Sequence, residues 1–391
     1  DVSGTYMLAD QSGFVTGRVS AHRDGYGFVH PSSGKRDNIF LPPQEASRAL
    51  DNDRVIVESW GRPGRMEGRL VQVVGRTRQL AVGTYVEQGK RQAFVIPYDK
   101  NLQTQGNIRV PPTQMARDGD VVKVRLGIGA ELLEPGDGLY GEVAGSVGKP
   151  GDPSNEVLSI AYSQGFSDEF PPEVMDEADR ILPAVSEEEA RGENRRDLRQ
   201  MALVTIDGED ARDFDDAVYT EPHPQGFRLV VAIADVTHYV REGTAIDAEA
   251  LRRATSVYLP DRVLPMLPER LSNGICSLRP DEDRLCMVAD MVLDRSGRLV
   301  SSEIYPGVMR SHARCTYNEV QDVLDGKDVP HRNAFKPQFE RLMELARVLM
   351  RMRKERGAID FETQETRIIF GEGRKIAEIR PTQRNDAHKL I

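Results

Sequence analysis

The chain has 391 residues, of which 39% are hydrophobic, and its formal net charge is −10. It is too long for one ordinary core, so we expect two to four domains. No apolar run approaches the roughly 20 residues of a membrane span, so we expect no membrane partner. The first residues carry neither a signal peptide nor an initiator Met, so we expect a piece of a longer product.

The charge is unevenly distributed along the chain. Residues 1–150 hold 19 basic and 17 acidic side chains, whereas residues 151–391 hold 33 and 45. The first part is therefore mildly basic and can meet a polyanion through a local patch. The three scattered cysteines, Cys276, Cys286 and Cys315, favour reduced thiols and a cytoplasmic protein over a zinc site or a disulfide framework.

After an N-terminal tail (1–12), residues 13–76 alternate apolar and polar side chains in short runs separated by Gly and Asp turns. Such short, evenly spaced strands predict a small five-stranded barrel of the OB type. The expected strands are 13–19, 25–30, 38–41, 54–57 and 69–74.

Three aromatic residues of this segment, Tyr26, Phe28 and Phe40, are predicted to share one strand face. Arg23, Lys35 and Arg36 lie near them in the sequence. Aromatic rings among basic side chains form the stacking platform that single-stranded nucleic acid requires. The alternative is that Tyr26 and Phe28 point into the barrel core.

Residues 77–150 repeat this pattern more loosely, and we predict a second OB-type barrel there. The Asp118–Asp120 turn before a Val-rich strand resembles the Asp51–Asp53 turn of the first segment. The aromatic residues Phe94 and Tyr98 fit the core as well as they fit a contact surface.

In residues 151–391 helical patterns join the strand patterns, and we predict an α+β domain with a mainly antiparallel sheet. Helices are expected over 171–182, 186–200, 245–254, 318–324 and 338–357, and strands over 202–206, 216–220, 227–236, 285–293 and 299–308. Ser186 and Glu189 have the spacing of a capping box at the start of the second helix.

The densest chemistry lies between Asp207 and Asp216, where half of ten residues are aspartate. Carboxylates at this density repel one another unless a cation intervenes. Because no His or Cys accompanies them, the set Asp207, Asp213, Asp215 and Asp216 favours Mg²⁺, or Mn²⁺, over zinc. Two such ions would suit phosphodiester hydrolysis. A structural Ca²⁺ loop fits the spacing poorly, and an exposed acidic turn fits the apolar flanks poorly.

The run 205–217, TIDGEDARDFDDA, resembles the signature of the RNB catalytic domain of the ribonuclease II superfamily, in wording closest to its bacterial ribonuclease R branch. Five more runs fit this resemblance: IADV (233–236), SVYLP (256–260), LSNGICSL (271–278), GAIDF (357–361) and NDAHKLI (385–391). The Gly-Tyr-Gly-Phe run of the first barrel resembles the RNA-binding strand of a cold-shock domain.

The resemblance implies processive 3′→5′ hydrolysis of single-stranded RNA to nucleoside 5′-monophosphates by a monomer. It places the metal and catalytic roles on the four aspartates, with Asp210 the least certain of the cluster, and it implies two Mg²⁺ ions. It also implies that Tyr258 and Phe361 clamp the terminal bases and that Tyr317 contacts RNA. For Tyr317 taken alone, a packed surface tyrosine is the alternative.

The family domain continues beyond residue 391, so we expect this chain to be a fragment. The arginine expected to stabilise the transferred phosphate would lie in the missing part. The rival hypothesis is an RNA-binding or remodelling protein whose RNB-like domain is inactive. Four intact carboxylates favour the enzyme.

Overall fold

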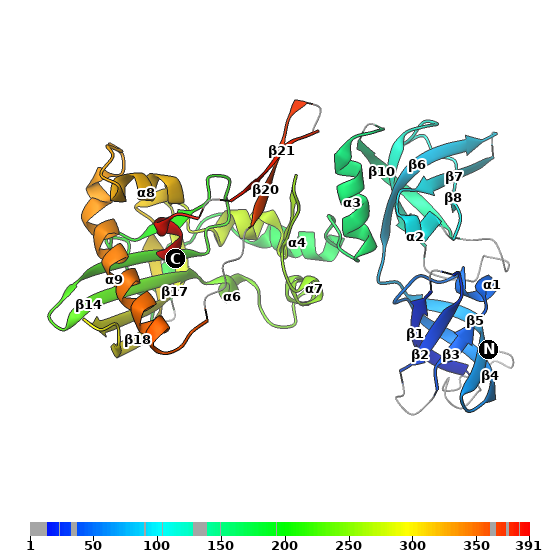
Figure 1. Ribbon diagram of the computed structural model, residues 1–391, viewed down its shortest axis with the longest axis horizontal. Helices are drawn as coiled ribbons and strands as arrows, with labels where there is room; N and C mark the ends of the chain where they lie inside the picture. The colour runs from blue at the N-terminus through cyan, green and yellow to red at the C-terminus, as the bar shows by residue number, and fades with distance from the viewer. Residues whose placement is uncertain are drawn as a thin grey trace. The chain divides into compact units, whose positions relative to one another are not determined.

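The structure is a computed structural model of the chain, and it describes residues 14–391 except 23, 33–36, 90, 104, 128–138, 149, 193, 360–364, 373–374 and 383. Two compact units make up the chain (Figure 1). The first runs to Asp168 and includes Leu259–Leu264 and Ile368–Glu378, and the second comprises Glu169–Tyr258, Pro265–Arg367 and Ile379–Ile391.

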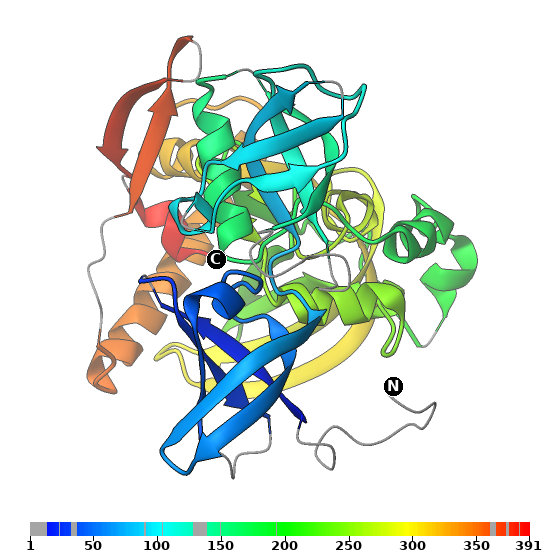
Figure 2. The same ribbon diagram turned by 90° about the vertical axis from the view of Figure 1, so that its right-hand side faces the viewer.

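The first five strands form a closed barrel in the order β1-β2-β3-β5-β4, as the spacing of the short strands predicts (Figure 2). Alternate side chains such as Val15, Val29 and Val57 fill its interior and are almost inaccessible to solvent. The elements are β1 (Phe14–Ala21), β2 (Gly27–Pro31), β3 (Ile39–Leu41), α1 (Pro43–Ala46), β4 (Arg54–Arg62) and β5 (Arg65–Gly75).

The next five strands form a second sheet in the order β10-β9-β6-β7-β8. A bridge between Arg109 and Tyr140 brings its two end strands together. Helix α3 (Pro153–Ser163) packs on this sheet through Leu158 and Tyr162, so the compact unit extends past residue 150 to Asp168. The other elements are β6 (Leu80–Gln88), β7 (Gln92–Pro97), α2 (Lys100–Gln103), β8 (Ile108–Val110), β9 (Val121–Leu126) and β10 (Gly141–Gly148).

The two barrels share a glycine–proline pair at the start of their first hairpin. Gly17 lies opposite Pro31 in β1–β2, and Gly83 lies opposite Pro97 in β6–β7. A Cβ atom at Gly17 would come within 2.5 Å of a carbonyl oxygen on the partner strand, and one at Gly83 within 2.2 Å. Only glycine permits this approach of the two strands at either position.

A buried ion pair joins the barrels. Arg76 Nη1 donates to Asp53 Oδ2 across 2.7 Å, and Arg76 Nε donates to the Gly127 carbonyl of the second barrel across 2.6 Å. Leu50 of the first barrel packs into the core of the second. The barrels are therefore held together by both polar and apolar contacts.

The second unit contains a seven-stranded sheet in the order β11-β18-β17-β14-β13-β12-β19. Neighbouring strands are antiparallel except for the β11–β18 and β12–β19 pairs, which confirms the predicted α+β class. The strands are β11 (Arg196–Asp197), β12 (Val204–Asp207), β13 (Asp216–His223), β14 (Gly226–Ala234), β17 (Asp283–Asp294), β18 (Leu299–Arg310) and β19 (Ala313–Thr316).

Helices α8 (Tyr317–Leu324) and α9 (Lys336–Glu355) cover one part of this sheet, with Phe339 and Leu342 in the shared core. The other helices are α4 (Pro172–Arg180), α5 (Glu187–Arg191), α6 (Val236–Tyr239), α7 (Ala245–Arg253), a π-helical segment (Arg270–Ile275) and 3-10 turns at Asn333–Phe335 and Asp386–Lys389. Two short hairpins complete the described chain: β15 (Val257–Tyr258) with β16 (Val263–Leu264), and β20 (Thr366–Phe370) with β21 (Ile376–Pro381).

The predicted helix 186–200 is wrong in its second half. Its capping box between Ser186 and Glu189 is present, but the helix ends at Arg191 because Gly192 adopts an extended conformation. The chain then enters β11, where it pairs with β18. None of the helices within the described residues is long and apolar enough to cross a membrane.

Candidate active site

The ends of two neighbouring strands position the first and last aspartates of the cluster. Asp207 is the last residue of β12 and Asp216 the first of β13, and these strands pair antiparallel through Val204 and Val218. Asp207 also lies opposite Thr316 of β19. The loop 208–215 therefore begins and ends at the same edge of the sheet.

Ser277 holds the second half of this loop. Its hydroxyl donates to the Arg212 carbonyl across 2.8 Å and accepts from the Phe214 amide across 3.0 Å. The Leu278 amide donates to the Phe214 carbonyl across 2.8 Å. Because Ser277 is fully buried, it fixes the backbone on both sides of Asp213.

Arg314 and Asn318 hold the first half of the loop. Arg314 Nη2 donates to the Gly208 carbonyl across 3.0 Å, and Asn318 Nδ2 donates to the Glu209 carboxylate across 2.8 Å. Both residues stand beside Thr316, the neighbour of Asp207 in the sheet. The loop is thus fixed in both its first and its second half.

Three of the four predicted carboxylates have raised pKa values. Partial burial is the main cause for Asp207, Asp215 and Asp216. Negative charge adds to it: Asp213 acts on Asp207 and Asp215, and Asp207 acts on Asp216. The sequence thus correctly predicts that these groups repel one another.

Asp210 has a different environment. Its side chain is 80% exposed and forms an ion pair with Arg367. The negative charges that raise the pKa values of Asp207, Asp215 and Asp216 come from Asp207, Asp213 and Asp215, and not from Asp210. Asp210 is therefore set apart from the candidate site.

The donor set fits a hard divalent cation, because it consists of carboxylates without thiols or imidazoles. In the described part of the chain, however, no three His, Cys, Asp or Glu side chains are grouped closely enough to hold a metal ion. The four carboxylates are near enough to influence one another's charge, yet they do not converge on one point as the sequence led us to expect.

Tyr258 lies beside the aspartates. Its ring is 69% exposed, and its hydroxyl donates to Asp213 Oδ2 across 3.2 Å. Burial raises the pKa of the Tyr258 hydroxyl, and the negative charges of Asp213, Asp215 and Asp207 raise it further. An exposed ring beside the carboxylates is what base stacking next to a cleavage site requires.

Tyr317 also belongs to this site. Burial, followed by the charges of Asp207 and Asp216, raises the pKa of its hydroxyl. Its ring stacks on His388, with the centroids 4.0 Å apart. Phe361, the other predicted base contact, lies outside the described residues.

Sequence reasoning missed Ser277, Arg314 and His388 as parts of the site. Ser277 and His388 stand inside runs that carry the family resemblance and Arg314 does not, but nothing in the sequence spacing of the three residues shows that they touch the aspartate loop or Tyr317. Their roles depend on contacts between segments far apart in the chain.

The aromatic residues of the first barrel form a cluster on its outer surface. The rings of Tyr26, Phe28 and Phe40 lie 5.7–5.8 Å apart, and His22 stacks on Tyr26 at 4.3 Å. Phe28 is 36% exposed, whereas its neighbour Val29 is buried in the core. The rings therefore face outward. The basic residues Arg23, Lys35 and Arg36 lie outside the described residues.

Comparison with known proteins identifies the family. Residues 195–391 match the model of the RNB domain, residues 17–73 the ribonuclease B OB domain, and residues 94–171 the cold shock domain. Ribonuclease R of Acidithiobacillus ferrooxidans is 38% identical, over 92% of this chain and 81% of the relative. This chain belongs to the ribonuclease R family.

Other ribonuclease R relatives are similar over almost the whole chain. The Vibrio cholerae protein is 42% identical and the Escherichia coli K12 protein 43% identical, each over 99% of this chain and 47% of the relative. The chain thus spans about half the length of these relatives. The apo form of Mycoplasma genitalium RNase R has the same fold, at 25% identity and a TM-score of 0.77, over 96% of this chain and 59% of that one.

Proposed function

We propose that this chain supplies the RNA-binding barrels and the carboxylates of a processive 3′→5′ exoribonuclease that releases nucleoside 5′-monophosphates from single-stranded RNA. The observation that carries the proposal is the juxtaposition of mutually repelling carboxylates with the exposed ring of Tyr258. Membership of the ribonuclease R family supports it.

We further propose that Asp207, Asp213, Asp215 and Asp216 hold two Mg²⁺ ions, with Mn²⁺ as a substitute. When bound, such ions supply an activated water and stabilise the leaving oxygen. Other side chains position the loop and the RNA. Ser277 and Arg314 hold the loop, and Tyr258 stacks on the last base and so positions the phosphodiester bond. Stacking does not depend on base identity, so it suits processive degradation of any sequence.

The choice of RNA follows from the relatives as well as from the aromatic surfaces. One Mycoplasma genitalium RNase R structure contains ribose methylated single-stranded RNA, and another contains double-stranded RNA. We assign single-stranded RNA to this chain because both aromatic sites present exposed rings, which stack on unpaired bases. We also propose that it acts as a cytoplasmic monomer; its three cysteines are buried and unpaired.

The test uses the full-length protein with 5′-labelled single-stranded RNA and Mg²⁺. We expect a ladder that shortens from the 3′ end, and we expect Asp215→Asn to retain binding but to lose cleavage. RNA with a blocked 3′ end should resist degradation. Binding without any ladder in the parent would favour the alternative, an RNA-binding protein with an inactive RNB domain.

A further inference from the structure

The outer surface of the first barrel carries a row of residues that crosses four strands. Phe28 of β2 lies opposite Phe40 of β3, Phe40 lies opposite Glu67 of β5, and Glu67 lies opposite Trp60 of β4. Directly opposed residues of paired strands point to the same side of a sheet. The row therefore joins the Phe28–Phe40 cluster to Trp60 on one face.

Trp60 is unusually exposed for a large apolar side chain. Its side chain is 49% accessible, although tryptophan carries one of the largest apolar surfaces of any residue. The residues that flank this row on the core side, Val29, Ile39 and Gly68, are buried, which places the row on the outside of the barrel. Trp60 is thus a large aromatic ring held on a rigid strand and open to solvent.

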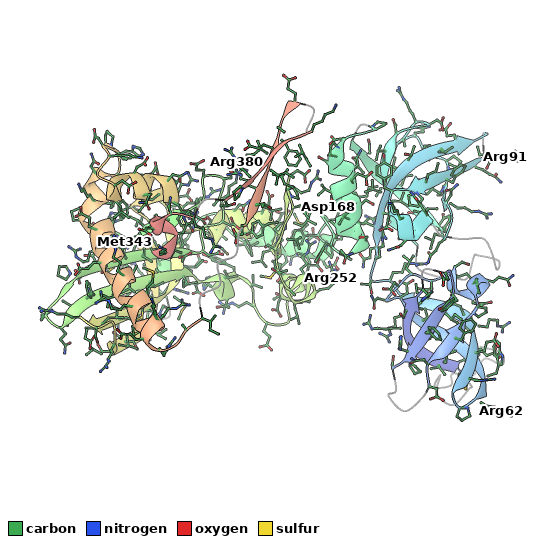
Figure 3. The ribbon with its side chains drawn as sticks, viewed as in Figure 1. Arg62, Arg91, Asp168, Arg252, Met343 and Arg380 are labelled. Carbon is green, nitrogen blue, oxygen red and sulfur yellow. The ribbon has the colours of Figure 1, made fainter. Side chains whose placement is uncertain are left out.

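The charges around Trp60 suit a nucleic acid strand. Arg62 and Arg65 lie opposite each other at the tip of the β4–β5 hairpin, and both are exposed. Figure 3 labels Arg62 at this tip. Arg69 is neutralised by Glu58 across 2.8 Å. Glu67, between Phe40 and Trp60, is the unfavourable charge, because its carboxylate repels phosphate. The basic hairpin tip follows Trp60 along β4, at the opposite end of this strand from the turn at residues 51–53.

We propose that Trp60 is the far end of an RNA-binding platform that begins at Tyr26 and Phe28, and that it stacks on a base of single-stranded RNA. Trp60 lies two strand spacings, about 10 Å, from Phe40. A strand stacked on the Phe28–Phe40 cluster would cross Glu67 and meet the ring next. This inference deepens the proposed function and rests on it, since it takes RNA as the ligand.

The chain contains a single tryptophan, so its fluorescence reports on this position alone. The experiment titrates the Asp215→Asn chain with a twelve-nucleotide uridine oligomer without Mg²⁺, and follows both tryptophan emission and the anisotropy of labelled RNA. We expect emission to be quenched with the same Kd as the anisotropy change. Trp60→Ala should raise that Kd about five- to tenfold.

Two further variants sharpen the test. Val74→Ala removes another exposed apolar side chain of β5 (37% accessible) outside the row, and it should leave the Kd unchanged. Glu67→Gln removes the repelling carboxylate and should lower the Kd about two- to threefold. RNA binding with unchanged emission and an unchanged Kd for Trp60→Ala would overturn the proposal and leave the proposed function intact. Absence of RNA binding by anisotropy would count against both.

Discussion

The hydroxyl of Tyr258 donates a hydrogen bond to the Asp213 carboxylate across 3.2 Å, so an exposed aromatic ring and a candidate metal ligand are joined directly. The two roles can be separated by mutation. Tyr258→Phe keeps the stacking surface and removes the hydrogen bond, whereas Tyr258→Ala removes both.

If stacking dominates, Tyr258→Phe will bind single-stranded RNA within about twofold of the parent, and Tyr258→Ala will bind at least about fivefold more weakly. Anisotropy of labelled RNA, measured without Mg²⁺, gives both affinities. Equal losses in the two variants would show that the hydroxyl, rather than the ring, makes the contact.

Ser277→Ala should impair turnover more than binding. The variant leaves the Phe214 amide and the Arg212 carbonyl without their buried partner, which costs about 1–3 kcal/mol of stability and lets the loop shift. We expect kcat to fall about ten- to a hundredfold with KM nearly unchanged. A change in KM alone would contradict a role in positioning the aspartates.

Ser272→Ala is the matched control for this variant. Ser272 lies in the same run, 271–278, and its buried hydroxyl has no hydrogen-bond partner among the residues that the structure describes. Removing it should leave kcat unchanged and should not lower the melting temperature.

Asp210→Asn should leave activity within about twofold of the parent, in contrast to Asp215→Asn. Asp210 is 80% exposed and pairs with Arg367 at the surface, where ion pairs contribute little. Single-turnover cleavage of labelled RNA by both variants makes the comparison. Equal losses would place Asp210 inside the catalytic set.

Arg76→Met should destabilise the first unit by about 3–5 kcal/mol, because it leaves Asp53 as an uncompensated buried carboxylate. Burial already raises the pKa of Asp53 from 3.8 to about 6, despite the opposing charge of Arg76. Because the pKa of Asp53 is higher in the folded protein than in the unfolded chain, protonation of Asp53 favours folding. The stability that Asp53 contributes in this way is fully present below about pH 4 and is lost as the pH rises through 6.

Without Arg76 the pKa of Asp53 rises further, and the loss of stability should be larger at pH 8 than at pH 5. Urea unfolding at the two pH values measures the difference. Adding Asp53→Asn to Arg76→Met should remove the pH dependence. A loss of the same size at both pH values would mean that Asp53 stays ionised throughout.

Much of this architecture follows from local patterns. Alternation around Val15 and Val29 predicts the first barrel, and the apolar run before Asp207 predicts β12, because period-two burial is a local property. The end of α5 at Arg191 was missed because the charged residues that follow favour a helix, whereas pairing of β11 with β18 decides otherwise. Tertiary contacts overrode propensity there.

The candidate site was predicted in its residue types but not in its support. A cluster of carboxylates is visible in the sequence, and so is the motif that contains Tyr258. The contacts of Ser277 with the loop join residues 63 and 65 positions apart, and no periodicity encodes such a distance. Nor did spacing show that Asp210 pairs with Arg367.

The glycine–proline pairs of the two barrels suggest a common ancestry. Counted from those pairs, the strands correspond residue by residue: Phe94 takes the place of Phe28, and Arg109 lies opposite Phe94 as Phe40 lies opposite Phe28. On this face the second barrel keeps one ring, Phe94, and carries Arg109 where the first barrel carries Phe40. The substitution Arg109→Phe would place on the second barrel the ring that Phe40 supplies on the first. RNA binding by that variant would show whether surface chemistry or position in the chain determines which barrel binds RNA.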